Sequence, residues 1–272
     1  MSKKINKLIE KIKHLSETEY YNITIQKEKP GIFDSKIGGL PYWTGDKDFP
    51  LDETGKKLFL LAQINFEKEQ TSFPLPSKGL LQFFIADNDL MGINFDDQIT
   101  QKNFRVIYHE NIDNAISEEY VEQLGIQTSE KADNYPVREQ YKISLTKNKD
   151  YVNIYDIQFN KIFADAYKEV YGKKIKSNER YDNILNDKDI EKLEEELSSN
   201  AVFHKILGYA YFTQEDPRYN KKYENYDTLL LQLDSEGDCI MWGDMGVANF
   251  FIPKKALEEK DFSNVLYNWD CS

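Results

Sequence analysis

Four segments of the chain carry apolar residues every three or four positions, which is the spacing of a helix with one buried face. The first is at the N-terminus, where Ile5, Leu8, Ile9, Ile12 and Leu15 form one stripe and lysines occupy the opposite face. The others lie at 116–124, 162–170 and 190–197. The N-terminal helix is basic, so it either docks on the body of the protein or lies on an anionic membrane or a partner, and docking is the favoured interpretation.

Residues that favour caps and turns mark the ends of these helices. We expect Asp113 to cap the second helix, and we expect Gly125 and Gly172 to end the second and the third. The polar sequence at 234–238 predicts a tight hairpin in which Gly237 accepts a positive φ. Between them, these positions divide the chain into short elements.

Short runs rich in β-branched, aromatic and leucine residues predict nine strands. They lie at 57–66, 80–86, 105–109, 141–145, 202–212, 228–234, 239–242, 249–252 and 265–269. Strands follow strands without a regular alternation with helices, which favours an antiparallel α+β architecture over a doubly wound parallel sheet. We therefore expect a β-rich α+β fold with its helices packed at the periphery.

The chain repeats part of its own sequence. Residues 36–44 and 205–213 share the pattern K-I-x-G-x-x-Y-aromatic-T, 169 positions apart. The next three blocks keep the same order, with offsets that change only in loops: 60–65 with 229–234, 79–85 with 246–252, and more weakly 106–109 with 265–268. The last block makes Asn268 the counterpart of His109. Four collinear matches predict an internal duplication with two pseudo-symmetric halves.

The repeat gives a domain organisation. We expect one compact domain over residues 1–272, which is short enough for a single large domain. Its parts are an N-terminal helix at 1–20, a first repeat at 30–110, a mostly helical insertion at 111–200 and a second repeat at 200–272.

Composition and charge exclude several classes of function. The chain has 47 acidic and 35 basic residues, a net charge of −12, and only four arginines, so a generic nucleic-acid binder is not expected. Its longest apolar runs are far shorter than the roughly 20 residues that span a bilayer, and its N-terminus is too charged for a signal peptide. Cys239 and Cys271 do not have the spacing of a metal or redox motif. We expect a cytoplasmic protein with no membrane span.

The sequence contains few candidates for catalytic or metal-binding residues. Of the three histidines, His109 is the best candidate for a base, although a core or solvated role is the favoured interpretation. Asp87 and Asp89 are the least unsuitable metal ligands, and a turn is the better interpretation of that segment. The sequence lacks a phosphate-binding loop, a nucleophile elbow and a zinc-protease motif. We therefore predict no catalytic residue, no cofactor and no metal.

Several polar residues are candidates for binding. Gln63 and Gln232 lie inside apolar runs, where each either satisfies backbone groups or lines a groove between the halves. Arg218 either pairs with a nearby carboxylate or anchors a ligand. Asp244 lies between glycines and either caps a turn or projects into a cleft. With their aromatic neighbours, the candidate binding residues are Trp43, Gln63, Arg218, Gln232, Trp242 and Asp244.

Seven segments resemble the YwqG-like family of bacterial proteins of uncharacterised function. They are GGLPY at 38–42, LAQIN at 61–65, LPSKGLLQFF at 75–84, LGYAYFTQEDPR at 207–218, LLQLDS at 230–235, WGDMG at 242–246 and YNWDC at 267–271. The chain departs from the family pattern at Ala210, where a proline corresponding to Pro41 is expected. The resemblance implies an α+β fold with internal pseudo-symmetry and no established reaction. It also implies occurrence beside secreted-toxin genes in some bacteria, which allows an immunity role.

Two functional hypotheses follow. The first is a cytoplasmic binding protein without an evident catalytic site, an immunity-type protein that covers a basic toxin partner with its acidic surface. The alternative is a binder of a small molecule or peptide, with an enzyme as one form of it, that uses a groove at the seam between the repeats. An enzyme is the less favoured of these interpretations.

Overall fold

Ten strands form one antiparallel sheet in the computed structural model, which describes residues 2–198 and 201–272. The order of the strands across the sheet is β10-β9-β8-β7-β1-β6-β2-β3-β4-β5. Their bounds are β1 Thr18–Gln26, β2 Lys36–Ile37, β3 Phe59–Asn65, β4 Leu80–Ile85, β5 Phe104–His109, β6 Tyr141–Asp150, β7 Lys205–Leu207, β8 Thr228–Asp234, β9 Val247–Ile252 and β10 Leu266–Asp270. This confirms the β-rich antiparallel α+β architecture.

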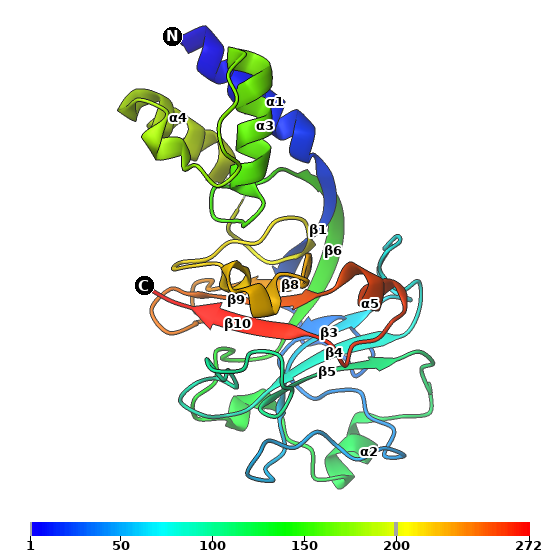
Figure 1. Cartoon of the computed structure of the whole chain (residues 1–272). Helices are drawn as coiled ribbons and strands as arrows, with labels where there is room; N and C mark the ends of the chain where they lie inside the picture. Colours follow the sequence, from blue (N-terminus) through cyan, green and yellow to red (C-terminus); the bar gives the residue numbers. More distant parts are fainter. Residues whose placement is uncertain (1, 199–200) are drawn as a thin grey trace.

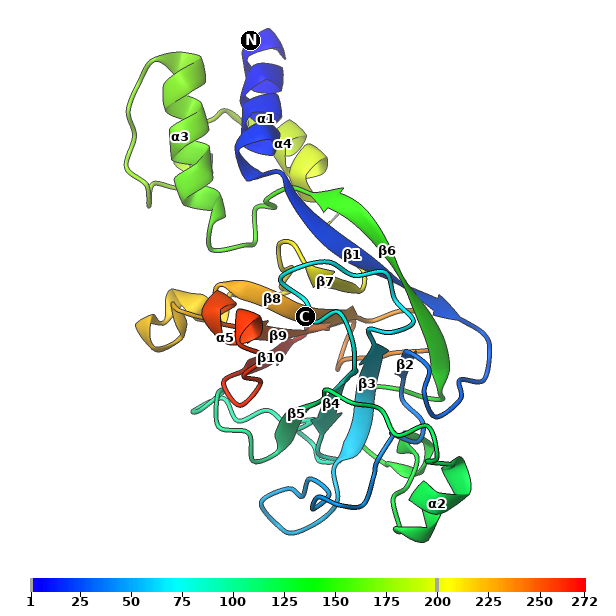
Figure 2. The same cartoon turned by 90° about the vertical axis from the view of Figure 1, so that its right-hand side faces the viewer.

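The two longest strands lie at the centre of the sheet. β1 and β6 pair over nine residues, from Thr18 opposite Asp150 to Gln26 opposite Lys142, and form the long twisted ribbon in Figures 1 and 2. β2–β5 continue the sheet on one side and are here called the first unit, and β7–β10 continue it on the other and are called the second unit. Each unit therefore begins beside the central ribbon and ends at a sheet edge.

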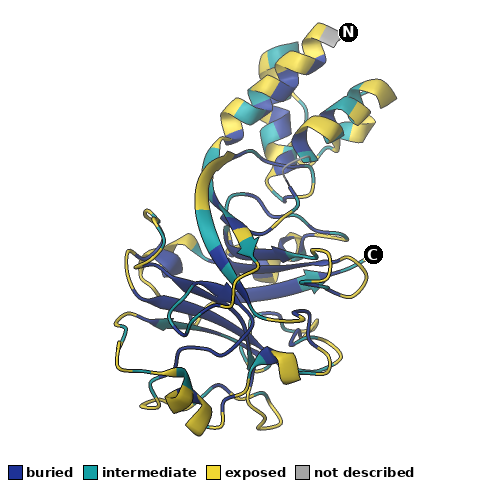
Figure 3. Ribbon diagram, turned by 180° about the vertical axis from the view of Figure 1, so that it is seen from behind, coloured by how far each residue is buried: buried dark blue, intermediate teal, exposed yellow. Residues whose placement is uncertain are grey.

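The sheet curls into a nearly closed, barrel-like shape, so that the two units pack against each other (Figure 2). The ring of Phe83 lies 5.0 Å from that of Phe250, and the ring of Phe104 lies 5.3 Å from that of Tyr267. The backbone N–H of Tyr267 donates to the carbonyl of Gln98, which joins a loop of the first unit to β10. Apolar side chains from both units thus build one shared core. The strands of the sheet are coloured mostly as buried in Figure 3.

Three helices form a second layer at one end of the ribbon (Figure 1). They are α1 Ser2–Ser16, α3 Phe159–Tyr171 and α4 Asp187–Ser198. Leu8, Phe163 and Leu193 are fully buried where they meet, so the N-terminal helix docks on the rest of the protein through its apolar stripe. Leu15 alone of that stripe is exposed. In the described part of the chain, no helix is both long and apolar enough to cross a membrane.

Two short helices lie beside the units and differ from the expectations. α2 Glu118–Gln123 begins at Ser117, whose side chain accepts the backbone N–H of Tyr120, so Ser117 and not Asp113 is its cap. α5 Lys254–Glu258 follows β9 directly and has no predicted counterpart. The end of α3 is as expected, because Gly172 adopts a left-handed conformation with φ +69.

Four strand assignments also need correction. The chain leaves α1 at Ser16 and enters β1 at Thr18, so 18–26 is a strand that the amphipathic stripe concealed. The expected helical insertion contains β6, which is longer than predicted and central to the sheet. Only Lys205–Leu207 of the segment 202–212 forms a strand. The segment 239–242 is not a strand, because Ile240 makes only isolated bridges, to Val137 and Glu236.

Candidate functional site

The two predicted amides are buried, and both the nitrogen and the oxygen of each bond main-chain groups; Gln63 Oε1 also accepts Gln82 Nε2. Gln63 Nε2 donates to the carbonyls of Ile32 and Asp34, and its Oε1 accepts the backbone N–H of Tyr42. All of these groups lie within the first unit or the loops that border it. Gln63 therefore ties a loop to β3 and leaves no polar atom for a ligand.

Gln232 makes the corresponding contacts in the second unit. Its Nε2 donates to the carbonyls of Ala201 and Phe203, and its Oε1 accepts the backbone N–H of Tyr211. Each of these partners lies 169 positions after the partner of Gln63. Satisfaction of backbone groups, the favoured interpretation, describes both amides.

His109 lies in the core of the first unit. Its Nε2 lies 2.9 Å from Gln82 Oε1, and its ring packs edge-on against Trp43. Gln82 Nε2 donates to the carbonyl of Tyr42, so its Oε1 is the acceptor and His109 carries its proton on Nε2. Burial, with a smaller contribution from Lys47, lowers the pKa of His109 to about 4. The imidazole is therefore a neutral structural donor.

The register of the sheet changes the predicted counterpart of His109. His109 lies opposite Leu80, whereas Asn268 lies opposite Asn249 and Asp270 lies opposite Val247. Leu80 and Val247 are the first residues of β4 and β9, which occupy the same place in their units. The counterpart of His109 is thus Asp270, which accepts the N–H and the hydroxyl of Thr213.

Arg218 is buried in an ion cluster. Its guanidinium donates to Asp216 and to Asp156, with nitrogen–oxygen distances of 2.6 and 2.9 Å, and lies over the ring of Phe251. Burial lowers the pKa of Arg218, but the charges of Asp156 and Asp216 outweigh it and the net shift is upward. Burial also raises the pKa of Asp216. Of the two predicted roles for Arg218, the ion pair describes this geometry.

The other three candidates do not form one cluster with Gln63, Gln232 and Arg218. Trp43 is buried in the first unit, where its Nε1 donates to the carbonyl of Lys47. Trp242 is fully buried near Trp269, and its Nε1 has no partner within the described residues. Asp244 is exposed in the loop before β9. The six residues are spread over both units, and a shared binding role for them stays a prediction.

A pair of buried lysines was missed by the sequence analysis. Lys36 Nζ donates to the carbonyls of Gly31 and Leu40, and burial lowers the pKa of Lys36 to about 7. Lys205, 169 positions later, lies 3.4 Å from Asp150, and burial lowers its pKa as well. The recurrent K-I-x-G pattern contains both positions, but lysine is usually a surface residue, so the pattern alone does not indicate that these two are buried. Both lysines anchor the short first strand of a unit.

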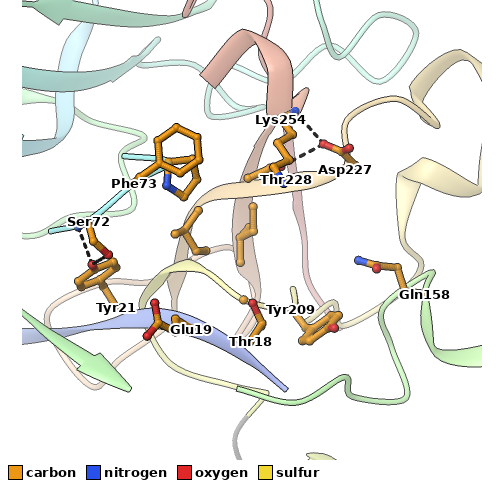
Figure 4. Close-up of a pocket in the computed structure, with 14 residues that line it drawn as sticks. Thr18, Glu19, Tyr21, Ser72, Phe73, Gln158, Tyr209, Asp227, Thr228 and Lys254 are labelled. Atoms are coloured by element: carbon orange, nitrogen blue, oxygen red, sulfur yellow. Dashed lines mark hydrogen bonds between the residues drawn. The ribbon is translucent and has the colours of Figure 1, made fainter. Parts of the chain in front are cut away.

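A groove opens at the seam between the units, beside the central ribbon (Figure 4). This seam groove has a volume of about 590 Å³. Its walls come from β1, the loop between β3 and β4, the residue before α3, the end of β7 with the loop that follows, the start of β8 with the residue before it, and α5. The lining residues are Thr18, Glu19, Tyr21, Ser72, Phe73, Pro74, Gln158, Leu207, Gly208, Tyr209, Asp227, Thr228, Leu229 and Lys254. None of the six predicted binding residues is among these described side chains.

The groove exists because β7 is short. β7 pairs with β1 only at residues 20–22 and with β8 only through Lys205 and Gln232. In the described sheet, Thr18 and Glu19 of β1 and the first residues of β8 therefore have a paired strand on one side only. The two edges diverge past Leu207, whose φ of +64 turns the chain away.

The groove walls combine fixed polar groups with an exposed ring. The hydroxyl of Tyr21 holds Ser72 through both the hydroxyl and the backbone N–H of that serine, which fixes the loop of the first unit. Phe73 follows it on the rim with 74% of its surface exposed (Figure 4). Across the groove, Asp227 accepts the backbone N–H of Lys254. The groove is thus a preformed cleft with polar and aromatic walls, which suits an organic ligand or a peptide.

The last observations concern possible metal ligands and the family to which the chain belongs. Within residues 2–198 and 201–272, histidine, cysteine and acidic side chains do not gather in threes in a way that could hold a metal ion. No curated protein matches the chain. Residues 35–271 match the family described as Domain of unknown function (DUF1963). That match spans well over half of the 272 residues, and the chain belongs to this family.

Proposed function

We propose that the protein is a binding protein whose seam groove holds a segment of extended peptide. The observation that carries this proposal is the pair of strand edges, Thr18–Glu19 in β1 and the start of β8, that border a preformed cavity of about 590 Å³. An extended chain binds such edges through main-chain hydrogen bonds, and neighbouring pockets select its side chains.

The exposed ring of Phe73 supports the same proposal. Among the exposed large apolar side chains of the described residues, Phe73 has the greatest exposed fraction, 74%, so a partner that covers it gains the free energy of removing apolar surface from water. Its loop is held by the bonds from Tyr21 to Ser72, so the ring is presented in place and little ordering entropy is lost on binding. Phe73 is therefore the expected aromatic anchor of the site.

We also propose that the two units arose by internal duplication, within the YwqG-like branch of the family. Both units have a bulge at the same place, between Leu60 and Ala62 in β3 and between Leu229 and Leu231 in β8. The contacts of Gln63 and Gln232 match partner by partner. Unrelated sheets have no reason to share a bulge and its buried amide.

A cytoplasmic immunity-type role, expected from the charge of −12, stays a prediction. Complementary charge would speed the association of a basic toxin with this protein. Mixing the protein with the product of an adjacent toxin-like gene at low salt is its test. If no complex forms and cells are not protected from the toxin, the immunity role is contradicted, whereas the proposal that the seam groove binds a peptide is unaffected.

Selection from a displayed library of random peptides tests the groove. We expect selected peptides to bind the wild type and to bind Phe73→Ala at least tenfold more weakly, because a buried aromatic anchor contributes on the order of 2 kcal/mol. Phe95→Ala, which removes a ring with 60% of its surface exposed outside the groove, should bind as the wild type does. Selected peptides that bind all three proteins equally would contradict the proposal.

A further inference from the structure

The first unit has a gap in the same place, and the chain's own segment 129–139 occupies part of it, beside a pocket lined by Phe59 and Asp87. β2 is as short as β7, so β3 also begins without a second neighbour. There Tyr135 is buried, and its hydroxyl donates to the carbonyl of Phe59, the first residue of β3. The ring of Tyr135 lies 5.8 Å from that of Phe59.

Further contacts on both sides of Tyr135 hold this internal segment. The carboxylate of Asp87 accepts the backbone N–H groups of Asp133 and Asn134. Val137 packs over Gly38 so closely that a Cβ on that glycine would lie 3.1 Å from a methyl group of the valine. The segment begins with a 3-10 turn at Ser129–Lys131, and its backbone pairs with residues 239–241, where Val137 bridges Ile240. Its tyrosine is thus inserted at the start of β3 and held there from both sides of the chain.

The register identifies the residues of the second unit that occupy the same positions. Phe59 lies opposite Ile85 and Thr228 lies opposite Ile252, so Thr228 corresponds to Phe59 and Lys254, two residues past Ile252, corresponds to Asp87. Leu207, 169 positions after Gly38, takes the place of that glycine. Leu207, Thr228 and Lys254 all line the seam groove.

These correspondences define what the groove offers. Because the register is shared, the carbonyl of Thr228 stands beside Ile252 as that of Phe59 stands beside Ile85. A carbonyl oxygen has two lone pairs, and that of Phe59 accepts the hydroxyl of Tyr135, so the carbonyl of Thr228 can accept a hydroxyl in the same way. Lys254 places an exposed ammonium where Asp87 places a carboxylate. The charge at this position is reversed, so the complementary ligand group is an anion rather than a pair of N–H groups.

We propose that the seam groove binds an extended peptide whose tyrosine side chain inserts into the groove, and that this peptide carries an acidic residue two positions before the tyrosine. The phenol donates to the carbonyl of Thr228, as Tyr135 does to Phe59, and the acidic side chain pairs with Lys254. The ring of Phe73 covers the bound tyrosine from the rim. This inference rests on the proposed function and names its ligand.

A peptide with the sequence of residues 133–138, Asp-Asn-Tyr-Pro-Val-Arg, is the probe, because it carries both features. We expect titration calorimetry to detect its binding to the full-length protein. Replacing its tyrosine with phenylalanine should weaken binding about 3- to 10-fold, the loss expected for one hydrogen bond. Replacing the tyrosine with leucine should weaken it further. Equal affinity for the three peptides would overturn the inference.

A charge swap tests the role of Lys254. Lys254→Glu should weaken the probe about threefold or more, and a probe with lysine in place of its aspartate should recover that loss on the variant. Lys29→Glu, an exposed change outside the groove, is the matched control and should leave the affinity unchanged. Failure of the swapped pair to recover affinity would overturn the proposed contact.

The library selection separates this inference from the proposed function. Selected peptides that depend on Phe73 but carry neither a tyrosine nor an acidic residue would overturn the inference and keep the function. A selection that yields no groove-dependent peptide, together with no binding of the probe, would overturn both.

Discussion

Gln63 accepts the backbone N–H of Tyr42 at 3.0 Å, inside a region that water does not reach. The same amide donates to two carbonyls of the preceding loop. A single side chain thus satisfies three main-chain groups that the short strand β2 leaves without strand partners. This explains why a glutamine occurs in an apolar strand. Gln63 does not line the seam groove, and its role is to stabilise the fold.

Gln63→Leu should lower the free energy of unfolding by about 3 to 5 kcal/mol, because it leaves several buried polar groups unsatisfied at about 1 to 3 kcal/mol each. Urea unfolding of the purified variant measures the change. Gln232→Leu should lose a similar amount, whereas Gln123→Leu, at an exposed position of α2, should change stability by less than about 0.5 kcal/mol. A stable Gln63→Leu would contradict the structural role.

Arg218→Met should destabilise the protein by about 3 to 5 kcal/mol, because Asp156 and Asp216 would remain buried without their cation. Thermal and urea unfolding both report this loss. Arg180→Met is the control, since Arg180 pairs with Asp182 at the surface and should contribute less than about 1 kcal/mol. If the two variants were equally stable, the buried cluster would not support the second unit.

His109 makes stability depend on acidity. Burial lowers its pKa to about 4, from an ordinary value of 6.5, so the folded state binds fewer protons than the unfolded state between these pH values. Its contribution is full above pH 6.5 and is lost as the pH falls toward 4. From pH 7 to pH 4, the wild type should lose about 3 kcal/mol relative to His109→Gln. Identical pH profiles would show that the imidazole titrates normally.

Lys36 makes stability depend on pH in the alkaline direction. Burial lowers its pKa from 10.5 to about 7, so the protein releases a proton on folding between these values and stability rises with pH there. From pH 6 to pH 9, the wild type should gain about 2 to 3 kcal/mol relative to Lys36→Met. Lys29→Met, at an exposed position, should show no such difference. If the stability difference between the wild type and Lys36→Met did not change with pH, the ammonium group of Lys36 would not lose its hydration on folding.

Local patterns in the sequence predicted much of the fold. The strand at 228–234 has the expected bounds, because its apolar run is closed by turns on both sides. The helix α3 ends at Gly172 because only a left-handed residue satisfies its last carbonyl. β1 was missed because its alternating polar residues, such as Asn22 and Thr24, follow a strong helical stripe without a turn. Its burial depends on β6, which is 115 or more residues away.

The candidate site was less predictable than the fold. Buried amides and Arg218 draw attention in a sequence because polar residues in apolar runs are unusual, yet here they satisfy main-chain groups and carboxylates. The groove instead arises from the shortness of β7, a property that no single residue type encodes. Phe73 gives one weak signal, since an aromatic residue beside Pro74 in a polar loop has no evident core to join. The residues that correspond between the gap beside β2 and the gap beside β7 could be matched only from the strand pairing of the two units, which the sequence does not show.

The proposed function requires an extended ligand to pair with the strand edges of the seam groove. The most direct measurement is the change in backbone amide chemical shifts when a library-selected peptide is added to the isotope-labelled protein. The largest changes are expected at Thr18, Glu19 and the start of β8, with smaller ones at Phe73. Changes centred on the acidic surface away from β1 and β8, with these amides unmoved, would contradict it.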